Sequence, residues 1–216
     1  MQSPVLFDVD GVILEGPRTD PQVYADATDA ALAELGVTPS QAQRRDLGSS
    51  DLEAVADRCA ELGIDPTTFW AAKERHASAG THERIRSGER SRYEDSDVID
   101  DLTERTTTAL VSNNRHATAA FVADYYDFDF DAVRGRDPTF EGYRRRKPDP
   151  YYLERTLEGL GIDDGVYVGD SPKDVVAGRQ AGLETAFVQR PHNRDREVPD
   201  PTYELDSLWE LDRLLE

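Results

Sequence analysis

Carboxylates and a hydroxyl occur just where short apolar runs of this chain end. Asp8 and Asp10 follow Val5-Leu6-Phe7, Ser112 follows a β-branched run, and Asp170 follows another. Such runs are typical of buried parallel strands, whose carboxyl ends gather at one edge of a sheet, where ligands bind. Carboxylates crowded at that edge would repel one another. The pattern therefore predicts a bound cation, and oxygen-only ligands favour Mg²⁺.

Lys147 is expected at the same edge, because it stands just before a helix that starts at Asp149-Pro150. An anion could then bridge the cation and the lysine, and a phosphoryl group meets that requirement. Taken singly, Asp8 and Ser112 are more typical of turn and helix caps. The chemical interpretation depends on finding all of these residues together.

The elements that must carry these residues alternate between strand and helix patterns. Strand-like segments lie at 5–7, 108–111, 132–133, 166–168 and 185–188, and helical segments at 97–104, 117–126, 149–161 and 172–182. The alternation predicts an α/β fold, a doubly wound parallel sheet with a Rossmann-like core. The tail from Pro199 to Glu216 has apolar residues at helical spacing, which predicts a docked helix.

Between residues 16 and 88 the strand pattern disappears. Helix starts at Asp20-Pro21, at a Ser50-x-x-Glu53 capping box and at Asp65-Pro66 predict an all-helical block. We expect this block, 16–88, to be a helical domain inserted into an α/β catalytic core formed by 1–15 and 89–216.

The polar motifs, in this order, resemble those of the haloacid dehalogenase-like hydrolase superfamily. They are Asp8-Val9-Asp10-Gly11-Val12, Ser112, Lys147 and Gly169-Asp170-Ser171-Pro172-Lys173-Asp174. Each motif alone is weakly specific, but the ordered set at strand ends and helix starts is typical of that family. The resemblance implies a phosphoric monoester hydrolase similar to phosphoglycolate phosphatases, acting on a small phosphorylated metabolite. The helical block stands where one branch of the family carries its cap domain.

The resemblance also implies roles for the residues that would act on phosphate. Asp8 would be the nucleophile that forms a phospho-aspartyl intermediate, and Asp10 the acid and base that serves the leaving group and then water. Ser112, the backbone N–H of Asn113 and Lys147 would bind the phosphoryl oxygens. The family's dehalogenases lack the second aspartate, so Asp10 favours phosphate-ester chemistry.

The metal ligands implied by the resemblance are an oxygen of Asp8, the backbone carbonyl of Asp10 and the carboxylate of Asp170, holding Mg²⁺. Asp174, one helical turn after Asp170, would bind through water or orient Lys147. The four histidines follow no metal-ligand spacing and are predicted to lie at the surface: His76, His82, His116 and His192.

The net charge and the lengths of the apolar runs disfavour two kinds of partner, nucleic acids and membranes. With 25 basic and 44 acidic residues the formal net charge is −19, which disfavours nucleic acid, and no apolar run is long enough to span a membrane. The first residues lack a signal-peptide pattern and the single cysteine excludes an internal disulfide, so we expect a cytoplasmic protein. Only three of the basic residues are lysines, and this acidic, lysine-poor composition suits a salt-adapted organism.

Two other functions stay open at this point. A sugar phosphomutase of the same superfamily would use the same residues and return the phosphate to a sugar. An inactive binding or regulatory module would keep the fold without turnover. The sequence leaves the substrate, the cap residues that contact it and the oligomeric state undetermined.

Overall fold

The computed structural model describes residues 3–214 of the chain, which form two compact units. The α/β unit comprises Met1–Arg18, Gly88–Arg136 and Arg145–Glu216, and the helical unit comprises Thr19–Ser87 and Asp137–Arg144. The helical unit therefore includes residues 137–144, although the sequence pattern predicts that this segment belongs to the α/β core.

The α/β unit is built on a six-stranded sheet in the order β3-β2-β1-β4-β5-β6, and each neighbouring pair is parallel. The strands are β1 (Val5–Phe7), β2 (Thr108–Arg115), β3 (Ala132–Arg136), β4 (Val166–Gly169), β5 (Glu184–Val188) and β6 (Tyr203–Leu205). This confirms the predicted doubly wound α/β fold with a Rossmann-like core. The central strand β1 is buried on both faces, which explains its continuous apolar sequence.

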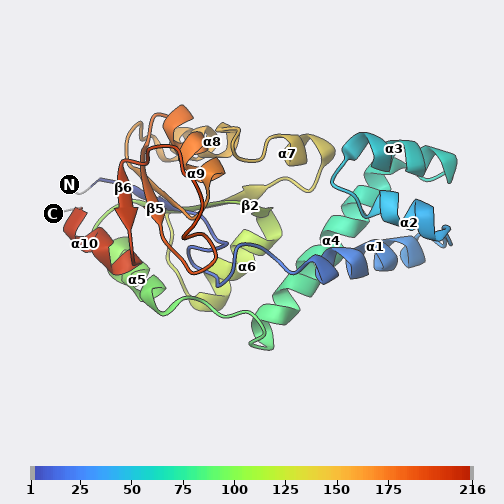
Figure 1. The fold of residues 1–216 in the computed structure, drawn as a ribbon, viewed down its shortest axis with the longest axis horizontal. Coiled ribbons are helices and arrows are strands. Elements are labelled where there is room, and N and C mark those ends of the chain that lie inside the picture. The colour runs from blue at the N-terminus through green and yellow to red at the C-terminus, as the bar shows by residue number, and fades with distance from the viewer. Residues whose placement is uncertain (1–2, 215–216) are drawn as a thin grey trace. The chain divides into compact units, whose positions relative to one another are not determined.

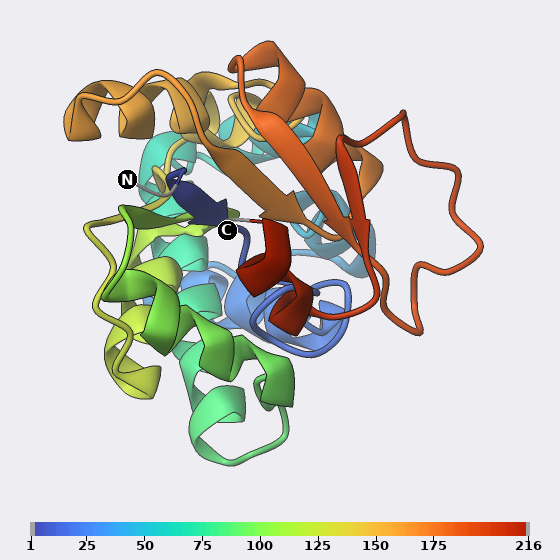
Figure 2. The same ribbon diagram turned by 90° about the vertical axis from the view of Figure 1, so that its left-hand side faces the viewer.

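Helices cover both faces of this sheet (Figures 1 and 2). Helices α8 and α9 lie on one side, with α5 and α6 on the other. The bounds in the α/β unit are η1 (Glu94–Asp97), α5 (Val98–Thr103), α6 (His116–Tyr126), α8 (Tyr151–Leu160), α9 (Pro172–Gln180), η2 (Leu208–Glu210) and α10 (Leu211–Leu214), where η marks a 3₁₀-helix. One apolar core includes Leu6, Ala109, Val111, Tyr152, Leu153, Leu157, Tyr167, Ala177 and Leu183.

The register of the central strands explains why the polar motifs meet. Phe7, the last residue of β1, lies opposite Leu110 of β2 and Val168 of β4. The next residue, Asp8, donates its backbone N–H to the carbonyl of Val168 at 3.0 Å. Because β1, β2 and β4 are parallel, their carboxyl ends lie at the same edge of the sheet. Ser112 and Asp170 therefore lie beside the end of β1, where Asp8 follows.

The helical unit contains α1 (Pro21–Glu34), α2 (Gln41–Leu47), α3 (Leu52–Glu61), α4 (Pro66–Arg86) and α7 (Phe140–Arg144). Trp70 of α4 packs edge-on against the rings of Phe140 and Tyr143, with centroids 4.9 and 5.2 Å apart. These contacts explain why α7, far along the chain, belongs to this unit. Within residues 3–214, even the 21-residue helix α4 lacks the apolarity that crossing a membrane requires.

Two local predictions are wrong. The predicted tail helix is wrong in part, because residues 203–205 form the strand β6, which pairs with β5 and occupies backbone groups that the sheet edge would leave free. The helical prediction agrees with η2 and α10, which follow this strand. The predicted capping box at Ser50 does not form. Helix α3 is instead capped by Asp51, whose carboxylate accepts from the backbone N–H groups of Glu53 and Ala54 at 3.0 and 3.2 Å.

Candidate active site

Three buried carboxylates meet at the carboxyl edge of the sheet. Asp8 follows β1, Asp170 follows β4, and Asp174 lies in the first turn of α9. One oxygen from each lies within 4.8 Å of the others, and none of the three residues is more than 3% exposed. Ser171 fixes Asp174 by donating its hydroxyl and its backbone N–H to Oδ2.

Lys147 lies among these carboxylates. Its Nζ is 3.0 Å from Asp8 Oδ1 and 2.7 Å from Asp174 Oδ1, and it also donates to the phenol oxygen of Tyr167. The Tyr167 hydroxyl in turn donates to the carbonyl of Val111 at 2.9 Å. Two ion pairs and one hydrogen bond surround the buried ammonium group. Lys147 is therefore held in one position by its surroundings.

Burial and mutual repulsion perturb the acids of this cluster. Burial, together with repulsion from Asp174 and Asp8, raises the pKa of Asp170 to about 8. Burial also raises the pKa of Asp8 and outweighs the attraction of Lys147. Burial opposes the charge on Lys147, but the nearby carboxylates outweigh it and raise the lysine pKa well above its usual value. Burial alone would raise the pKa of Asp174, but the charges of Lys147 and Lys173, together with hydrogen bonds from Lys147 and Ser171, lower it.

This donor set fits a hard divalent cation. The cluster holds three carboxylates, and Lys147 contacts two of them, so the ionised cluster has an excess of negative charge that a cation would offset. Carboxylate oxygens are the ligands that Mg²⁺ accepts. The backbone of Gly11 approaches the same place, because a Cβ built there would lie 2.0 Å from Asp170 Oδ2. With a φ of +75° as well, this position requires glycine.

Asp10 lies outside this group of three. Its Oδ1 is 2.8 Å from Nη2 of Arg90, and 19% of the Asp10 side chain is exposed. Arg90 also donates from Nε to the carbonyl of Glu15 at 3.0 Å. Arg90, which the sequence analysis did not single out, therefore fixes the orientation of the Asp10 carboxylate.

The end of β2 is tied to the segment that carries Lys147. The Lys147 backbone N–H donates to Asn113 Oδ1 at 2.8 Å, and Asn113 Nδ2 donates to the Lys147 carbonyl at 3.3 Å. Ser112 Oγ accepts from the backbone N–H and the side-chain amide of Asn114, at 3.1 and 3.3 Å. The structure thus joins Ser112, Asn113 and Lys147 through neighbouring hydrogen bonds, and their contacts to phosphate stay a prediction.

His192 and Asn193, which follow β5, contact the carboxylate cluster as well. His192 Nε2 lies 2.6 Å from Asp170 Oδ2, and Asn193 Nδ2 donates to the Asp170 carbonyl at 2.8 Å. The prediction that His192 is a surface residue is therefore wrong, since only 17% of its side chain is exposed. No spacing rule links residues 22 positions apart, so the sequence carries no signal for this contact.

Comparison with known proteins identifies the family of the chain. A family model described as a haloacid dehalogenase-like hydrolase matches residues 5–182, the range that holds Asp8, Ser112, Lys147 and Asp170. The chain belongs to this family. It is similar to the phosphoglycolate phosphatase of Pseudomonas fluorescens (strain Pf0-1), with 24% identity over 218 residues that cover 96% of this chain and 77% of the relative.

Two solved structures share the fold over nearly their whole length. CbbY from Rhodobacter sphaeroides, in complex with phosphate, matches with a TM-score of 0.67 and 20% identity, covering 98% of this chain and 96% of that one. A HAD phosphatase from Thermococcus onnurineus matches with a TM-score of 0.60 and 23% identity, covering 100% and 98%. At these identities the likeness concerns the haloacid dehalogenase-like fold alone.

Proposed function

We propose that the protein is a Mg²⁺-dependent phosphatase that hydrolyses a small phosphate monoester through a phospho-aspartyl intermediate. The observation that carries this proposal is the position of Asp8. Its side chain is buried, its Oδ1 lies 3.0 Å from Lys147 Nζ, and it is grouped with Asp170 and Asp174. A cation at this cluster, together with Lys147, would attract an anionic phosphoryl group to the one carboxylate that ends the central strand. Membership of a hydrolase family supports the same class of reaction.

Asp8, Asp170 and the backbone carbonyl of Asp10 would hold the Mg²⁺ ion. When bound, the ion offsets the negative charge of the substrate and polarises its phosphoryl oxygens. Asp174 would orient Lys147, because one of its carboxylate oxygens pairs with Lys147 and the other accepts from Ser171.

In the proposed reaction Asp8 attacks phosphorus, the bond from phosphorus to the leaving oxygen breaks, and Asp10 gives that oxygen a proton. Water then attacks the phospho-aspartyl group while Asp10 takes up a proton, which releases inorganic phosphate and restores Asp8. Lys147, the Ser112 hydroxyl and the Asn113 backbone N–H would bind the transferred oxygens. The partial exposure of Asp10 suits a group that must reach both a leaving group and water.

We also propose that the helical unit serves as a cap and that the substrate is a small phosphorylated metabolite in the cytoplasm. A cap excludes bulk water from a reacting phosphate. The Pseudomonas fluorescens relative is a phosphoglycolate phosphatase, and a second CbbY structure holds xylulose-(1,5)bisphosphate. A net charge of −19 opposes nucleic-acid partners. Phosphoglycolate is therefore the first substrate to test.

The test is a screen of phosphoglycolate, sugar phosphates and p-nitrophenyl phosphate with Mg²⁺, measuring released phosphate and isomerised sugar. We expect phosphate release that a chelator and Asp8→Asn both abolish, and that Asp163→Asn, an exposed control, leaves unchanged. Formation of a sugar isomer without net phosphate release would show that the protein is a phosphomutase and not a phosphatase. Turnover that persists in chelator or in Asp8→Asn would contradict the mechanism, and a wild-type protein without turnover on any of these substrates would contradict the proposed activity.

Asp10→Asn tests the assignment of the acid and base. It should lower kcat by about 10²–10⁴-fold for alkyl phosphates, whose leaving oxygen needs a proton. The loss should be smaller for p-nitrophenyl phosphate, because nitrophenolate leaves without one. Steady-state kinetics on both substrates measure the difference, and an equal loss on both would show that Asp10 does not protonate the leaving group.

A further inference from the structure

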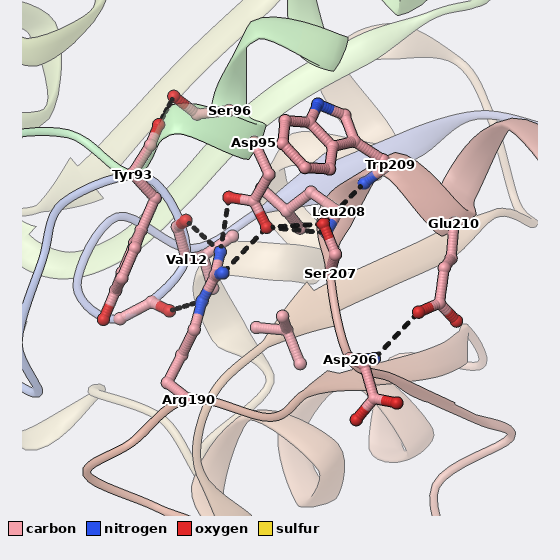
Figure 3. Close-up of polar contacts among 12 residues, drawn as sticks. Val12, Tyr93, Asp95, Ser96, Arg190, Asp206, Ser207, Leu208, Trp209 and Glu210 are labelled. Carbon is pink, nitrogen blue, oxygen red and sulfur yellow. Dashed lines mark hydrogen bonds and ion pairs between the residues drawn. The ribbon is translucent and has the colours of Figure 1, made fainter.

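Arg190 follows β5 and is buried, with 6% of the residue exposed. Figure 3 shows its guanidinium where three other segments of the α/β unit meet: the loop after β1, the segment of Tyr93 and Asp95, and the segment after β6. A buried guanidinium must find acceptors for its donors. Those acceptors show which parts of the molecule Arg190 holds together.

Two of its donors go to residues 8–14, which we call the nucleophile loop. Arg190 Nε donates to the carbonyl of Gly11 at 3.2 Å, and Nη2 donates to the carbonyl of Val12 at 3.1 Å. These carbonyls come directly after Asp10. Hydrogen bonds within the loop restrain it in part, and a contact from outside at Gly11, whose φ is +75°, adds a further restraint. Arg190 supplies such a restraint.

Arg190 is itself fixed by Asp95. The two form a bidentate pair, with Nη1 and Nη2 at 2.7 and 2.9 Å from the carboxylate oxygens. The same carboxylate accepts from the Ser207 hydroxyl and the Leu208 backbone N–H, both at 2.9 Å. The guanidinium carbon lies 3.8 Å from the centre of the Tyr93 ring. These contacts set both the position and the plane of the fork that holds the nucleophile loop.

The following residues reach the other half of the carboxylate cluster. His192 lies 2.6 Å from the carboxylate of Asp170, and Asn193 donates to the Asp170 carbonyl at 2.8 Å. Asn193 also donates to the carbonyl of Val188 and accepts from the backbone N–H of Arg190, at 3.0 and 2.7 Å. Within four successive residues, Arg190 thus contacts the loop that carries Asp10, while His192 and Asn193 contact Asp170, the residue that follows β4.

We propose that the segment Arg190–Asn193 positions the two halves of the carboxylate site relative to each other. Arg190, held by Asp95, orients the nucleophile loop, while His192 and Asn193 orient Asp170. The contacts of Arg190, His192 and Asn193 are made with other protein groups, so we assign each as a positioning residue. The inference rests on the proposed function, because it concerns the site that would hold Mg²⁺ and phosphate.

Two pairs of variants test the two ends of the segment. Arg190→Gln removes the fork, and Arg190→Lys keeps the charge for Asp95 without the planar geometry that serves the loop carbonyls. His192→Leu removes the contact to Asp170, whereas His192→Gln keeps an N–H donor at a similar position. Arg194→Gln, at the exposed residue that follows this segment, is the matched control.

The measurements are Mg²⁺ affinity by calorimetry, steady-state kinetics, and amide hydrogen exchange of the metal-free protein. Arg190→Gln and His192→Leu should weaken Mg²⁺ binding and lower kcat by about 10–100-fold, as loss of an outer partner of a metal ligand does. His192→Gln should recover most of the loss. In Arg190→Gln and Arg190→Lys, exchange should accelerate at Gly11, Ile13 and Leu14, whose amides are hydrogen-bonded within the loop.

Wild-type Mg²⁺ affinity and wild-type loop exchange in Arg190→Lys would overturn the role of Arg190, even if Arg190→Gln fails to fold. Wild-type affinity in His192→Leu would overturn the role of His192. Failure of the proposed function has a different signature, since the wild-type protein would then neither bind Mg²⁺ nor release phosphate. In that case the exchange of the metal-free loop still decides whether Arg190 positions it.

Discussion

Two of the three lysines are buried, one in each unit, and their surroundings differ. Lys147 in the α/β unit is 5% exposed and contacts two carboxylates and a phenol. Lys73 in the helical unit is 4% exposed. It donates to the carbonyl of Leu47 at 2.8 Å, and its Nζ lies 5.1 Å from the centre of the Trp70 ring. One lysine is thus placed among acids and the other beside a helix end and an apolar core.

Lys73 completes a local structure. Leu47 is the last residue of α2, so its carbonyl lacks a partner within that helix, and the ammonium supplies one. Lys147 instead holds carboxylates that a fold selected for stability alone would not bury, because desolvation can exceed the Coulombic gain. The charged partners of Lys147 therefore indicate a chemical site, while the contact of Lys73 with a backbone carbonyl indicates a structural role.

The same substitution at both lysines makes this comparison measurable. Lys147→Met should lower kcat about 10²–10³-fold, the loss typical of removing one group that stabilises developing charge. Lys73→Met should leave kcat unchanged and lower the free energy of unfolding by about 1–3 kcal/mol, because the Leu47 carbonyl loses its donor. Steady-state kinetics and urea unfolding give both values. Equal kcat values in the two variants would contradict the role assigned to Lys147.

The metal-free protein should become less stable as pH rises, and this effect should come from the α/β unit. The pKa of Asp170 is about 8 in the folded chain and about 3.9 in an unfolded one. Between these pH values the folded state keeps a proton that the unfolded state has lost, so the free energy of unfolding falls as pH rises. The contribution is fully present below about pH 4 and lost above about pH 8, with a slope of at most about 1.4 kcal/mol per pH unit.

Urea unfolding in chelator from pH 5 to pH 8 measures this slope. Asp170→Asn should flatten it, and Mg²⁺ should restore stability most strongly near pH 8, where it would meet the charged carboxylate. Asp29→Asn in the helical unit is the control, because the hydrogen bond from Arg44 lowers the pKa of Asp29 and moves its titration below this window. A slope that persists unchanged in Asp170→Asn would place its origin elsewhere.

The sequence predicted the candidate site well where the pairing of parallel strands alone brings its residues together. Asp8, Ser112 and Asp170 each follow an apolar run, and parallel pairing of these runs is enough to bring them to one edge. The helix that starts at Pro172 likewise places Asp174 beside that edge. Periodicity and cap residues are local signals, so these predictions need no knowledge of how the loops fold.

Contacts between distant segments carried no such signal. Tyr167 looks like an ordinary strand residue, yet its hydroxyl accepts from Lys147, and Arg190 reaches Gly11 across 179 positions. The strand at 203–205 has three residues, too few for an alternating pattern, and the sheet edge at β5 decides its conformation. These features depend on which surfaces the rest of the fold presents, and a single sequence does not encode that information locally.

Salt should change the stability of the protein in two opposite ways, by weakening the ion pairs of the helical unit and by screening the net negative charge of the whole chain. Pairs such as Arg44–Asp29 and Arg75–Glu34 are exposed, with between 41% and 59% of each side chain accessible. Exposed pairs of this kind contribute only about 0–1 kcal/mol each, and salt weakens them. The full chain has 44 acidic and 25 basic residues, so at least 19 acids have no basic residue to pair with one to one.

We therefore expect the protein to be more stable in concentrated KCl than in dilute buffer. The Debye length falls from about 10 Å at 0.1 M to about 3 Å at 1 M, which removes most of the repulsion among the excess acids. Relief of that repulsion should outweigh the weakened surface pairs and raise the unfolding midpoint by about 2–4 °C for each kcal/mol gained. A thermal unfolding series in KCl at fixed Mg²⁺ measures this, separately from activity, since salt also weakens binding of an anionic substrate. A midpoint that stays level or falls would show that the acidic composition is not an adaptation to high salt.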